Sequence, residues 1–220
     1  INSNDESIDL KIQKFLDMKK NINNLVVKPT PFVVSTHSAK AKLSISIKID
    51  VLSKIIYKNL TVFNEESINL PYFSIIYNDL NINLLNKNKK KKSKSSFFNC
   101  CSIIVKSIDN SNVNIKLFKN SSVTMTGCKT PDSGLVALRL LVNEIKKYKE
   151  VSDDDISKLD VEDYQVTMIN ANYKIGYKID ANELFSIIKN KYNLYVSYEP
   201  DRYQGVKIIY LWNFLNKSKD

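Results

Sequence analysis

The sequence predicts an α+β fold built from two pseudo-repeats, because a strand followed by a helix occurs twice. Residues 41–49 alternate between apolar and polar side chains, as a half-buried strand does, and residues 173–179 alternate in the same way. Each segment leads into an aspartate that is suited to cap a following helix, Asp50 or Asp180. Both segments also end in Lys-Ile-Asp, which indicates an internal duplication.

Helices are predicted where apolar residues recur with helical spacing. Glu183 completes a capping-box-like start after Asp180, and Thr130-Pro131-Asp132 has the cap, first-turn proline and acid of another helix start. An N-terminal helix is predicted within residues 8–27, before two prolines. The apolar stripes of the four helices are Leu52, Ile55 and Ile56; Leu184, Phe185 and Ile188; Leu135, Leu138, Val142 and Ile145; and Ile8, Ile12, Phe15, Leu16 and Ile22.

Residues 113–127 are predicted to form a hairpin whose two faces differ in chemistry. The core face carries Val113, Ile115, Leu117, Val123 and Met125, and the opposite face carries Asn114, Lys116, Phe118, Ser122, Thr124 and Thr126. Phe118 is therefore a lone aromatic on a cationic, hydroxyl-rich face. Such a face suits a protein that inserts a flat side chain between base steps in the minor groove. The alternative is a phenylalanine that is covered by the loop after residue 85 or by a partner.

The net charge of +10 over 220 residues predicts attraction to polyanions, of which nucleic acid is the most common. AT-rich coding DNA is an equally good reason for a lysine-rich composition. The lysine run at 86–96 is expected to be a solvated loop in an insertion over about residues 61–96; contact with DNA phosphates or a nuclear-localisation role is the alternative. Acidic residues concentrate at 151–163, which we interpret as a linker between the repeats.

Cysteine and histidine usage argues against a metal site and against catalysis. The chain has three cysteines without metal-ligand spacing and one histidine, His37, so neither a Cys/His nor a Ser/His/Asp set can be assembled. Cys100 and Cys101 are expected to point to opposite faces of a strand. We expect no enzyme activity and no cofactor. No apolar run is long enough to span a bilayer and no secretory signal is present, so we expect no membrane partner and no secretion.

Two motifs resemble a known family. In the segment from Ser197 to Tyr210, Tyr198, Glu199, Pro200 and Gly205 match the Y-E-P-x-x-F-P-G motif of the TATA-box-binding proteins. The segment 117–129 is similar to the hairpin I-F-S-S-G-K-x-V-x-T-G-A-K of the same family. The resemblance covers roughly residues 32–212. It implies a saddle, with a curved antiparallel sheet, helices on the convex face and two pseudo-repeats.

The resemblance also implies domain boundaries. Residues 1–31 would be an N-terminal helical extension, 32–150 the first repeat with the lysine-rich insertion, 151–163 the acidic linker and 164–220 the second repeat. That second repeat is expected to be incomplete, because the fourth of the family's wedge aromatics has no counterpart in it. Ser121 stands where the family's hairpin has a turn glycine, so the turn is expected to be strained or of another type.

Candidate DNA contacts follow from the resemblance, residue by residue. The family's intercalating aromatics align with Phe98 (with Phe97 as a competitor), Phe118 and Tyr203; groove-lining candidates are Thr124, Thr126 and Asn170; backbone-contact candidates are Lys42, Lys48, Lys116 and Lys129. The asparagines that donate to central bases in the family align with Phe32 and Met168, and Asn170 is a displaced donor candidate. This difference predicts weaker sequence specificity than is usual in the family.

The sequence as a whole predicts a noncatalytic transcription initiation factor that binds and bends AT-rich double-stranded DNA through the minor groove. General transcription factors or RNA polymerase are the expected protein partners. A large DNA virus or an AT-rich protist fits the composition, with a location in the nucleus, a cytoplasmic viral factory or the virion. The alternative is a protein-interaction module of the same fold that does not bind the TATA element. An enzyme is the weakest hypothesis.

Overall fold

The computed structural model describes Asp17 and residues 29–62, 70–86 and 99–210 of the chain. These residues belong to two compact units: a larger one over residues 31–173, and a smaller one that contains Thr30 and residues from Lys174 onward. Each unit is described separately below. No helix among the described residues is both long and apolar enough to cross a membrane.

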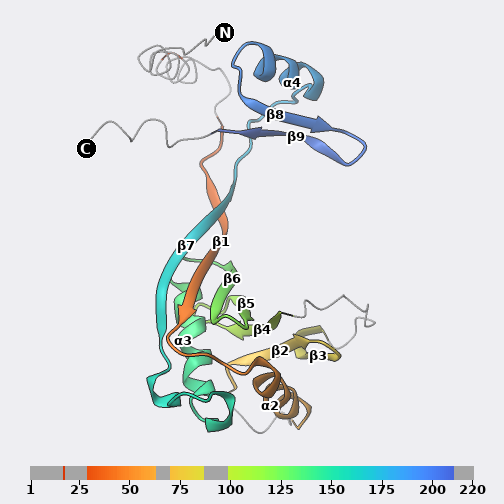
Figure 1. Ribbon diagram of the computed structural model, residues 1–220. Helices are drawn as coiled ribbons and strands as arrows, with labels where there is room; N and C mark the ends of the chain where they lie inside the picture. Colours follow the sequence, from red (N-terminus) through yellow and green to blue (C-terminus); the bar gives the residue numbers. More distant parts are fainter. Residues whose placement is uncertain (1–16, 18–28, 63–69, 87–98, 211–220) are drawn as a thin grey trace, which may run out of the picture. The chain divides into compact units, whose positions relative to one another are not determined.

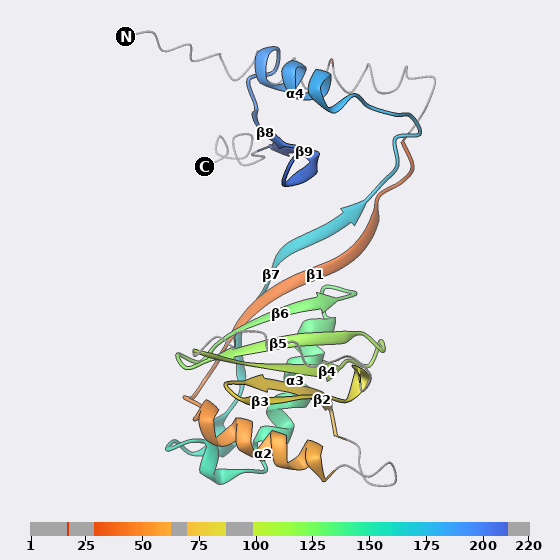
Figure 2. The same cartoon turned by 90° about the vertical axis from the view of Figure 1, so that its right-hand side faces the viewer.

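The larger unit is built on one antiparallel sheet of seven strands (Figure 2). Their order across the sheet is β3-β2-β4-β5-β6-β1-β7, so the first and last strands of the unit, β1 and β7, lie side by side. The strands are β1 (Val33–Leu43), β2 (Tyr72–Tyr77), β3 (Leu80–Asn83), β4 (Cys100–Lys106), β5 (Asn112–Phe118), β6 (Ser122–Cys128) and β7 (Val161–Asn172). β2 and β3 lie within the range 61–96 that the sequence assigned to an insertion, and both are strands of the main sheet.

Helices α2 (Ile49–Thr61) and α3 (Ser133–Ile145) pack on one face of this sheet (Figure 1). Their buried apolar residues form a single core with buried residues of β1, β2, β4, β5 and β6, among them Ala39, Ile75, Ile103, Ile115 and Met125. Three short 3-10 helices complete the unit: η1 (Leu84–Asn86), η2 (Lys149–Val151) and η3 (Ile156–Lys158). The predicted α+β class, with helices on one face of an antiparallel sheet, is confirmed.

The hairpin prediction for residues 113–127 is also confirmed. β5 and β6 pair in the register Ile115 opposite Met125 and Lys116 opposite Thr124. The five side chains predicted for the core face are all buried. Cys101 faces the core and Cys100 lies on the opposite face of β4, as expected, and neither forms a disulfide.

The strand prediction for residues 41–49 is wrong beyond Leu43. β1 ends there, and α2 begins at Ile49 with Lys48 as its N-cap residue. The intervening backbone bonds to the segment after α3: the Lys48 amide donates to the Val151 carbonyl at 2.7 Å, and the Ser152 hydroxyl donates to the Ser46 carbonyl at 2.7 Å. These long-range bonds replace the sheet partner that the alternation suggested.

Asp50 does not cap α2. It lies in the first turn of the helix, and its carboxylate accepts a hydrogen bond from the Tyr77 hydroxyl of β2. The apolar stripe of this helix is predicted correctly, since Leu52 and Ile56 are fully buried and Ile55 packs against the core.

The alternating segment 173–179 is not a strand. The strand of this region is β7, which begins at Val161 and ends at Asn172, so the last part of the predicted acidic linker belongs to the sheet. Most β7 side chains are exposed, and Asp163 adopts φ 51°. Apolar alternation in β7 is confined to Tyr164, Val166 and Met168, a short stretch of the strand. Pairing with β1 defines it instead.

The smaller unit contains helix α4 (Ala181–Asn190) and the hairpin of β8 (Tyr195–Glu199) and β9 (Tyr203–Ile209). The Asp180 carboxylate accepts from the amides of Asn182 at 2.8 Å and Glu183 at 3.0 Å, so the predicted cap is confirmed. Along the chain, β7-α4-β8 repeats the order β1-α2-β2. The N-terminal helix predicted within residues 8–27 lies outside the described residues, except at Asp17, which is helical.

Candidate nucleic-acid interface

The face of the seven-stranded sheet opposite α2 and α3 is called the open face here. Along β5, β6 and the second half of β1, every second side chain is buried in the core. The side chains between them therefore lie on the open face. The open face carries Thr36, Ser38, Lys40 and Lys42 of β1, Asn114, Lys116 and Phe118 of β5, and Ser122, Thr124 and Thr126 of β6.

Strand register arranges these side chains in rows that cross the sheet. One row runs Lys116, Thr124, Lys40 and Gln165 across β5, β6, β1 and β7. The next row runs Asn114, Thr126, Ser38 and Met168. The open face therefore places cations between hydroxyl and amide groups, the chemistry that hydrogen-bonds and neutralises nucleic-acid phosphates.

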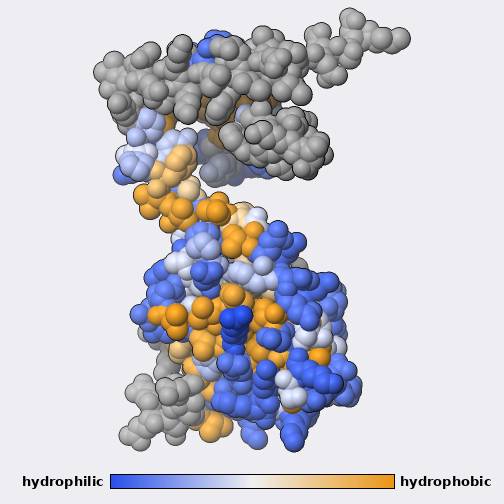
Figure 3. All heavy atoms as spheres, turned by 90° about the vertical axis from the view of Figure 1, so that its left-hand side faces the viewer, coloured by the Kyte–Doolittle hydropathy of each residue, from blue (hydrophilic) through white to orange (hydrophobic). Residues whose placement is uncertain are grey.

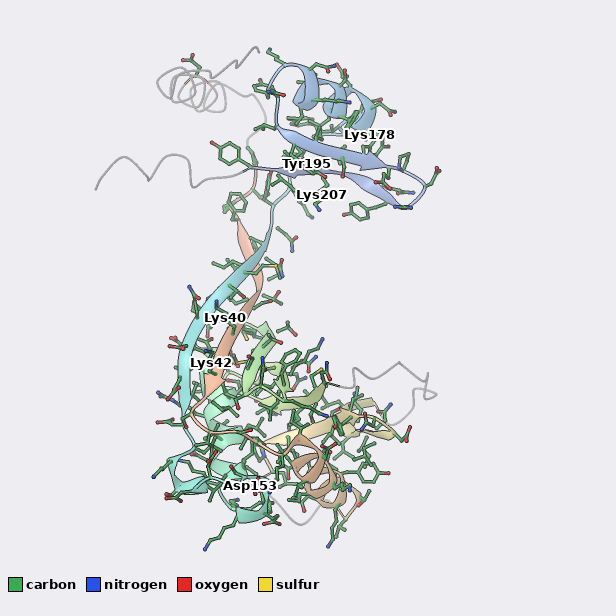
Figure 4. The ribbon with its side chains drawn as sticks, viewed as in Figure 1. Lys40, Lys42, Asp153, Lys178, Tyr195 and Lys207 are labelled. Carbon is green, nitrogen blue, oxygen red and sulfur yellow. The ribbon has the colours of Figure 1, made fainter. Side chains whose placement is uncertain are left out.

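Lys40 and Lys42 lie two residues apart on β1 (Figure 4). Neither of them forms an ion pair with a carboxylate of the described residues. They line a depression of about 710 Å³ together with Ser122, Thr124, Asp163 and Gln165. Cations without a paired acid remain available to an external anion.

Positive charge alone does not distinguish the open face. Lys54 and Lys146 are exposed on the helix side of the larger unit. The open face differs because its lysines stand in rows with short polar side chains, which leave room for a ligand to approach the strands.

A polar pair lies at the β1–β7 junction. Thr36 is opposite Asn170 in the register, and the Asn170 amide donates to the Thr36 hydroxyl at 3.0 Å. The Ser35 hydroxyl donates to the Asn170 carbonyl at 3.1 Å. Asn170, a groove-lining candidate, is therefore held in place by its neighbours. Thr36 was not among the predicted site residues, because β1 begins at Val33 and the apolar alternation that indicated a strand begins only at residue 41.

Of the other groove-lining candidates, Thr124 and Thr126 are exposed on the open face, where β6 places each between β5 and β1. The structure therefore brings together Thr124, Thr126, Asn170, Lys42 and Lys116 in the larger unit.

Two backbone-contact candidates lie elsewhere in the larger unit. Lys48 precedes α2 and is ion-paired with Asp153. Figure 4 shows Asp153 well away from Lys40 and Lys42. Lys129 follows β6 and lies near Asp109. Hydrogen bonds from Ser111 and Ser133 lower the pKa of Asp109 to about 2, so this carboxylate is ionised at neutral pH.

The wedge candidates have three different settings. Phe98 and its competitor Phe97 lie outside the described residues. Phe118 is the last residue of β5, opposite Cys100, and is half-buried. Tyr203 begins β9 in the smaller unit and is 71% exposed. Its ring covers Gly205, since a Cβ at that glycine would clash with Cε1 of Tyr203.

The β5–β6 turn keeps a left-handed residue although it lacks a glycine. Ser121 has φ 63°, which L residues other than glycine adopt at a cost. Its amide donates to the Phe118 carbonyl at 3.0 Å, and its hydroxyl donates to the Ile45 carbonyl at 3.1 Å. These bonds hold the strained residue in place.

Apolar side chains are exposed where β1 and β7 pair beyond the edge of β6. Phe32 and Tyr173 are in ring contact, with centroids 4.7 Å apart. This exposed apolar ribbon consists of Phe32, Val33, Val34, Met168, Ile169 and Tyr173 (Figure 3). Phe32, which aligns with one of the family's asparagines, precedes β1, and the residue opposite Asn170 is Thr36.

No protein-family model matches the chain. A curated protein of Acanthamoeba polyphaga mimivirus, described as TATA-box-binding protein-like, is 28% identical over 203 residues, which cover 86% of this chain and 52% of the viral protein. The chain thus spans about half the length of that relative. Among solved structures, Methanococcus jannaschii TBP matches with a TM-score of 0.43 and 14% identity over 80% of this chain and 75% of the other. The viral match agrees with the resemblance that the two sequence motifs indicate.

Proposed function

We propose that this chain, a divergent relative of the TATA-box-binding-protein-like proteins, binds AT-rich double-stranded DNA through the minor groove and bends it as a transcription initiation factor. The observation that carries the proposal is the open face, where lysines stand in rows among hydroxyl and amide groups on a sheet whose other face is covered by helices. A sheet face of this kind can follow a groove without an inserted helix.

Each kind of candidate side chain has a role in this proposal. Lys40, Lys42 and Lys116 attract the duplex and release its counterions. Thr124, Thr126 and Asn170 face the floor of the groove, where A·T pairs offer only acceptors. Phe118, at the end of β5, and Tyr203, in the smaller unit, are the described aromatics that would open base steps. Bending by such insertion favours deformable sequences.

Duplex binding is the direct test. Fluorescence anisotropy and end-to-end FRET on an AT-rich and a GC-rich duplex of equal length, across a salt series, measure affinity, bending and the number of phosphates neutralised. We expect binding that weakens steeply with salt, that favours the AT-rich duplex and that raises FRET. Salt-independent or absent binding would contradict the proposal.

The exposed apolar ribbon favours a second candidate function, that of a protein-interaction module. Val33, Val34, Met168 and Ile169 are between 48% and 66% exposed, and apolar surface of this kind marks protein contacts. In this case Ile169→Ser, which changes no charge and lies opposite His37 and not in an open-face row, would weaken binding to transcription factors or polymerase and leave DNA affinity unchanged. The nucleus or a viral factory is the proposed location for either function.

A further inference from the structure

We propose that segment 8–27 of this chain folds as an amphipathic helix against α4 and covers apolar surface that the smaller unit leaves exposed. The partner is part of the same chain, and its docking does not depend on DNA binding. Four features support this: the burial of the smaller unit, the pattern of the segment, the setting of Asp17 and the hydrogen bonds at Thr30.

The smaller unit has no fully buried core among its described residues. No residue from 174 to 210 is buried, whereas α2 and α3 of the larger unit both bury side chains in its core. One helix and a two-stranded hairpin of this size are rarely stable without further packing. The apolar side chains that are only partly covered are Ile175, Leu184, Phe185, Ile188, Leu194, Val196 and Val206. A further element is needed to cover them.

The exposed apolar surface follows α4. This helix lies against β8 and β9, and its stripe is half-buried there (Figure 1). Ile187, on the flank of the stripe, is 41% exposed. Ile179, just before the helix, and Tyr192, just after it, are 40% and 36% exposed. Apolar side chains are thus left uncovered at the start, on the flank and at the end of α4, as on a helix that packs beside a second one.

Segment 8–27 has the sequence pattern of such a second helix. One side of it carries an apolar stripe at helical spacing, made of Ile8, Ile12, Phe15, Leu16 and Ile22. Asp17 is helical and exposed. At 3.6 residues per turn, Asp17 lies on the side of the helix opposite the stripe. An exposed Asp17 is therefore what a stripe that faces the protein requires.

Hydrogen bonds hold the end of this segment within reach of α4. The Thr30 amide donates to the Lys174 carbonyl at 2.8 Å, and the Lys174 amide donates to the Thr30 hydroxyl at 2.9 Å. Lys174 leads to the Asp180 cap of α4, and the chain from residue 27 to Thr30 spans at most about 10 Å. A helix over 8–27 is about 30 Å long, twice the length of α4, so it can cover the whole of α4.

Residues 211–220 are the competing cover. Their apolar residues lie within 211–215, and a helix over these positions is about 8 Å long, half the length of α4. Segment 8–27 matches the exposed surface better in length and in pattern.

The docked segment has a consequence for the proposed wedge in the smaller unit. Tyr203 begins β9, in the hairpin against which α4 lies. This hairpin holds Tyr203 in position only while the unit is folded. Segment 8–27 is therefore part of what presents the aromatic side chain.

The first test measures hydrogen–deuterium exchange of the full chain by mass spectrometry. Phe15→Asp places a charge in the stripe, and Gln13→Asp is the matched control, because it changes the charge equally at a position outside the stripe. Trp212→Asp tests residues 211–220. Exchange in β5 and β6 checks that the larger unit is folded in each variant.

Phe15→Asp should speed exchange of the α4 amides about tenfold and leave β5 and β6 unchanged, because it opens only the smaller unit. Gln13→Asp should leave both regions unchanged. Unchanged α4 exchange in Phe15→Asp, equal acceleration in Gln13→Asp, or acceleration by Trp212→Asp alone overturns the proposal.

A second measurement does not depend on stability. Phe15 is replaced by p-benzoyl-phenylalanine, which keeps an aromatic ring and on irradiation forms a bond to the group that it contacts. Crosslinks to residues 174–194 of the same chain support the proposal. Crosslinks only to residues 211–220, to the larger unit or to a second copy overturn it. Neither measurement uses DNA, so failure here leaves the proposed function standing.

Discussion

The hydroxyl of Ser133, the first residue of α3, donates to the Asp109 carboxylate at 2.5 Å and joins this helix to the turn between β4 and β5. The same carboxylate accepts from the amide of Ser111 at 2.9 Å and from its hydroxyl at 2.5 Å. The link fixes α3 against the sheet whose other surface is the open face.

Asp109→Asn should destabilise the larger unit in a pH-dependent way. The pKa of Asp109 is lowered from 3.8 to about 2 in the folded protein. The ionised carboxylate therefore stabilises the fold fully above pH 3.8, and this stabilisation is lost as the pH falls towards 2. We expect a loss of about 1 kcal/mol in the free energy of unfolding at pH 7. Urea denaturation of the wild type and the variant at pH 7 and pH 2.5 measures the difference in their free energies of unfolding.

Asp132→Asn is the control for this substitution, because Asp132 precedes the same helix and makes no capping hydrogen bond with its side chain. It should have little effect at either pH. An equal loss of stability at both pH values for Asp109→Asn would show that the ionised carboxylate is not the cause.

Gly127→Ala should destabilise the centre of the sheet. Gly127 has φ 83° and lies at the bulge where β6 passes from Thr126, opposite Ser38, to Cys128, opposite His37. A Cβ there would lie 2.9 Å from the Asn112 carbonyl oxygen, which is backbone and cannot easily move. We expect a loss of about 2 kcal/mol, measured by urea denaturation.

Thr126→Ala gives the comparison for Gly127→Ala, because Thr126 is the exposed neighbour and its side chain can be shortened without backbone strain. Its effect should stay within about 0.5 kcal/mol. If both substitutions cost the same, the left-handed backbone at Gly127 is not what the sheet requires.

Phe118→Ala should reduce DNA bending, because it removes one of the two described aromatics proposed to open base steps and leaves Tyr203. End-to-end FRET on the bound AT-rich duplex should fall towards the value of the free duplex. Ile104→Ala, a half-buried residue of β4 on the same face, should leave FRET unchanged. Unchanged bending in Phe118→Ala would exclude this residue as a wedge.

Those parts of the fold in which local pattern and burial agree could be predicted from the amino-acid sequence. The β5–β6 hairpin, the buried stripes of α2 and α3 and the Asp180 cap follow from alternation, helical spacing and side-chain chemistry within a few residues. The open-face positions of Lys116, Thr124 and Thr126 follow from the same alternation. The family resemblance depends on two short motifs that can be read directly.

The end of β1 and the presence of β7 depend on contacts between distant segments. Bonds from Lys48 and Ser46 to Val151 and Ser152 replace sheet pairing beyond Leu43, although the alternation continues. Most β7 side chains are exposed, and its apolar alternation covers only residues 164–168. Its pairing with β1 is a contact between segments more than a hundred residues apart. That pairing brings Thr36 to Asn170 and Gln165 to Lys40. Local sequence cannot specify such neighbours, because they depend on how distant strands meet.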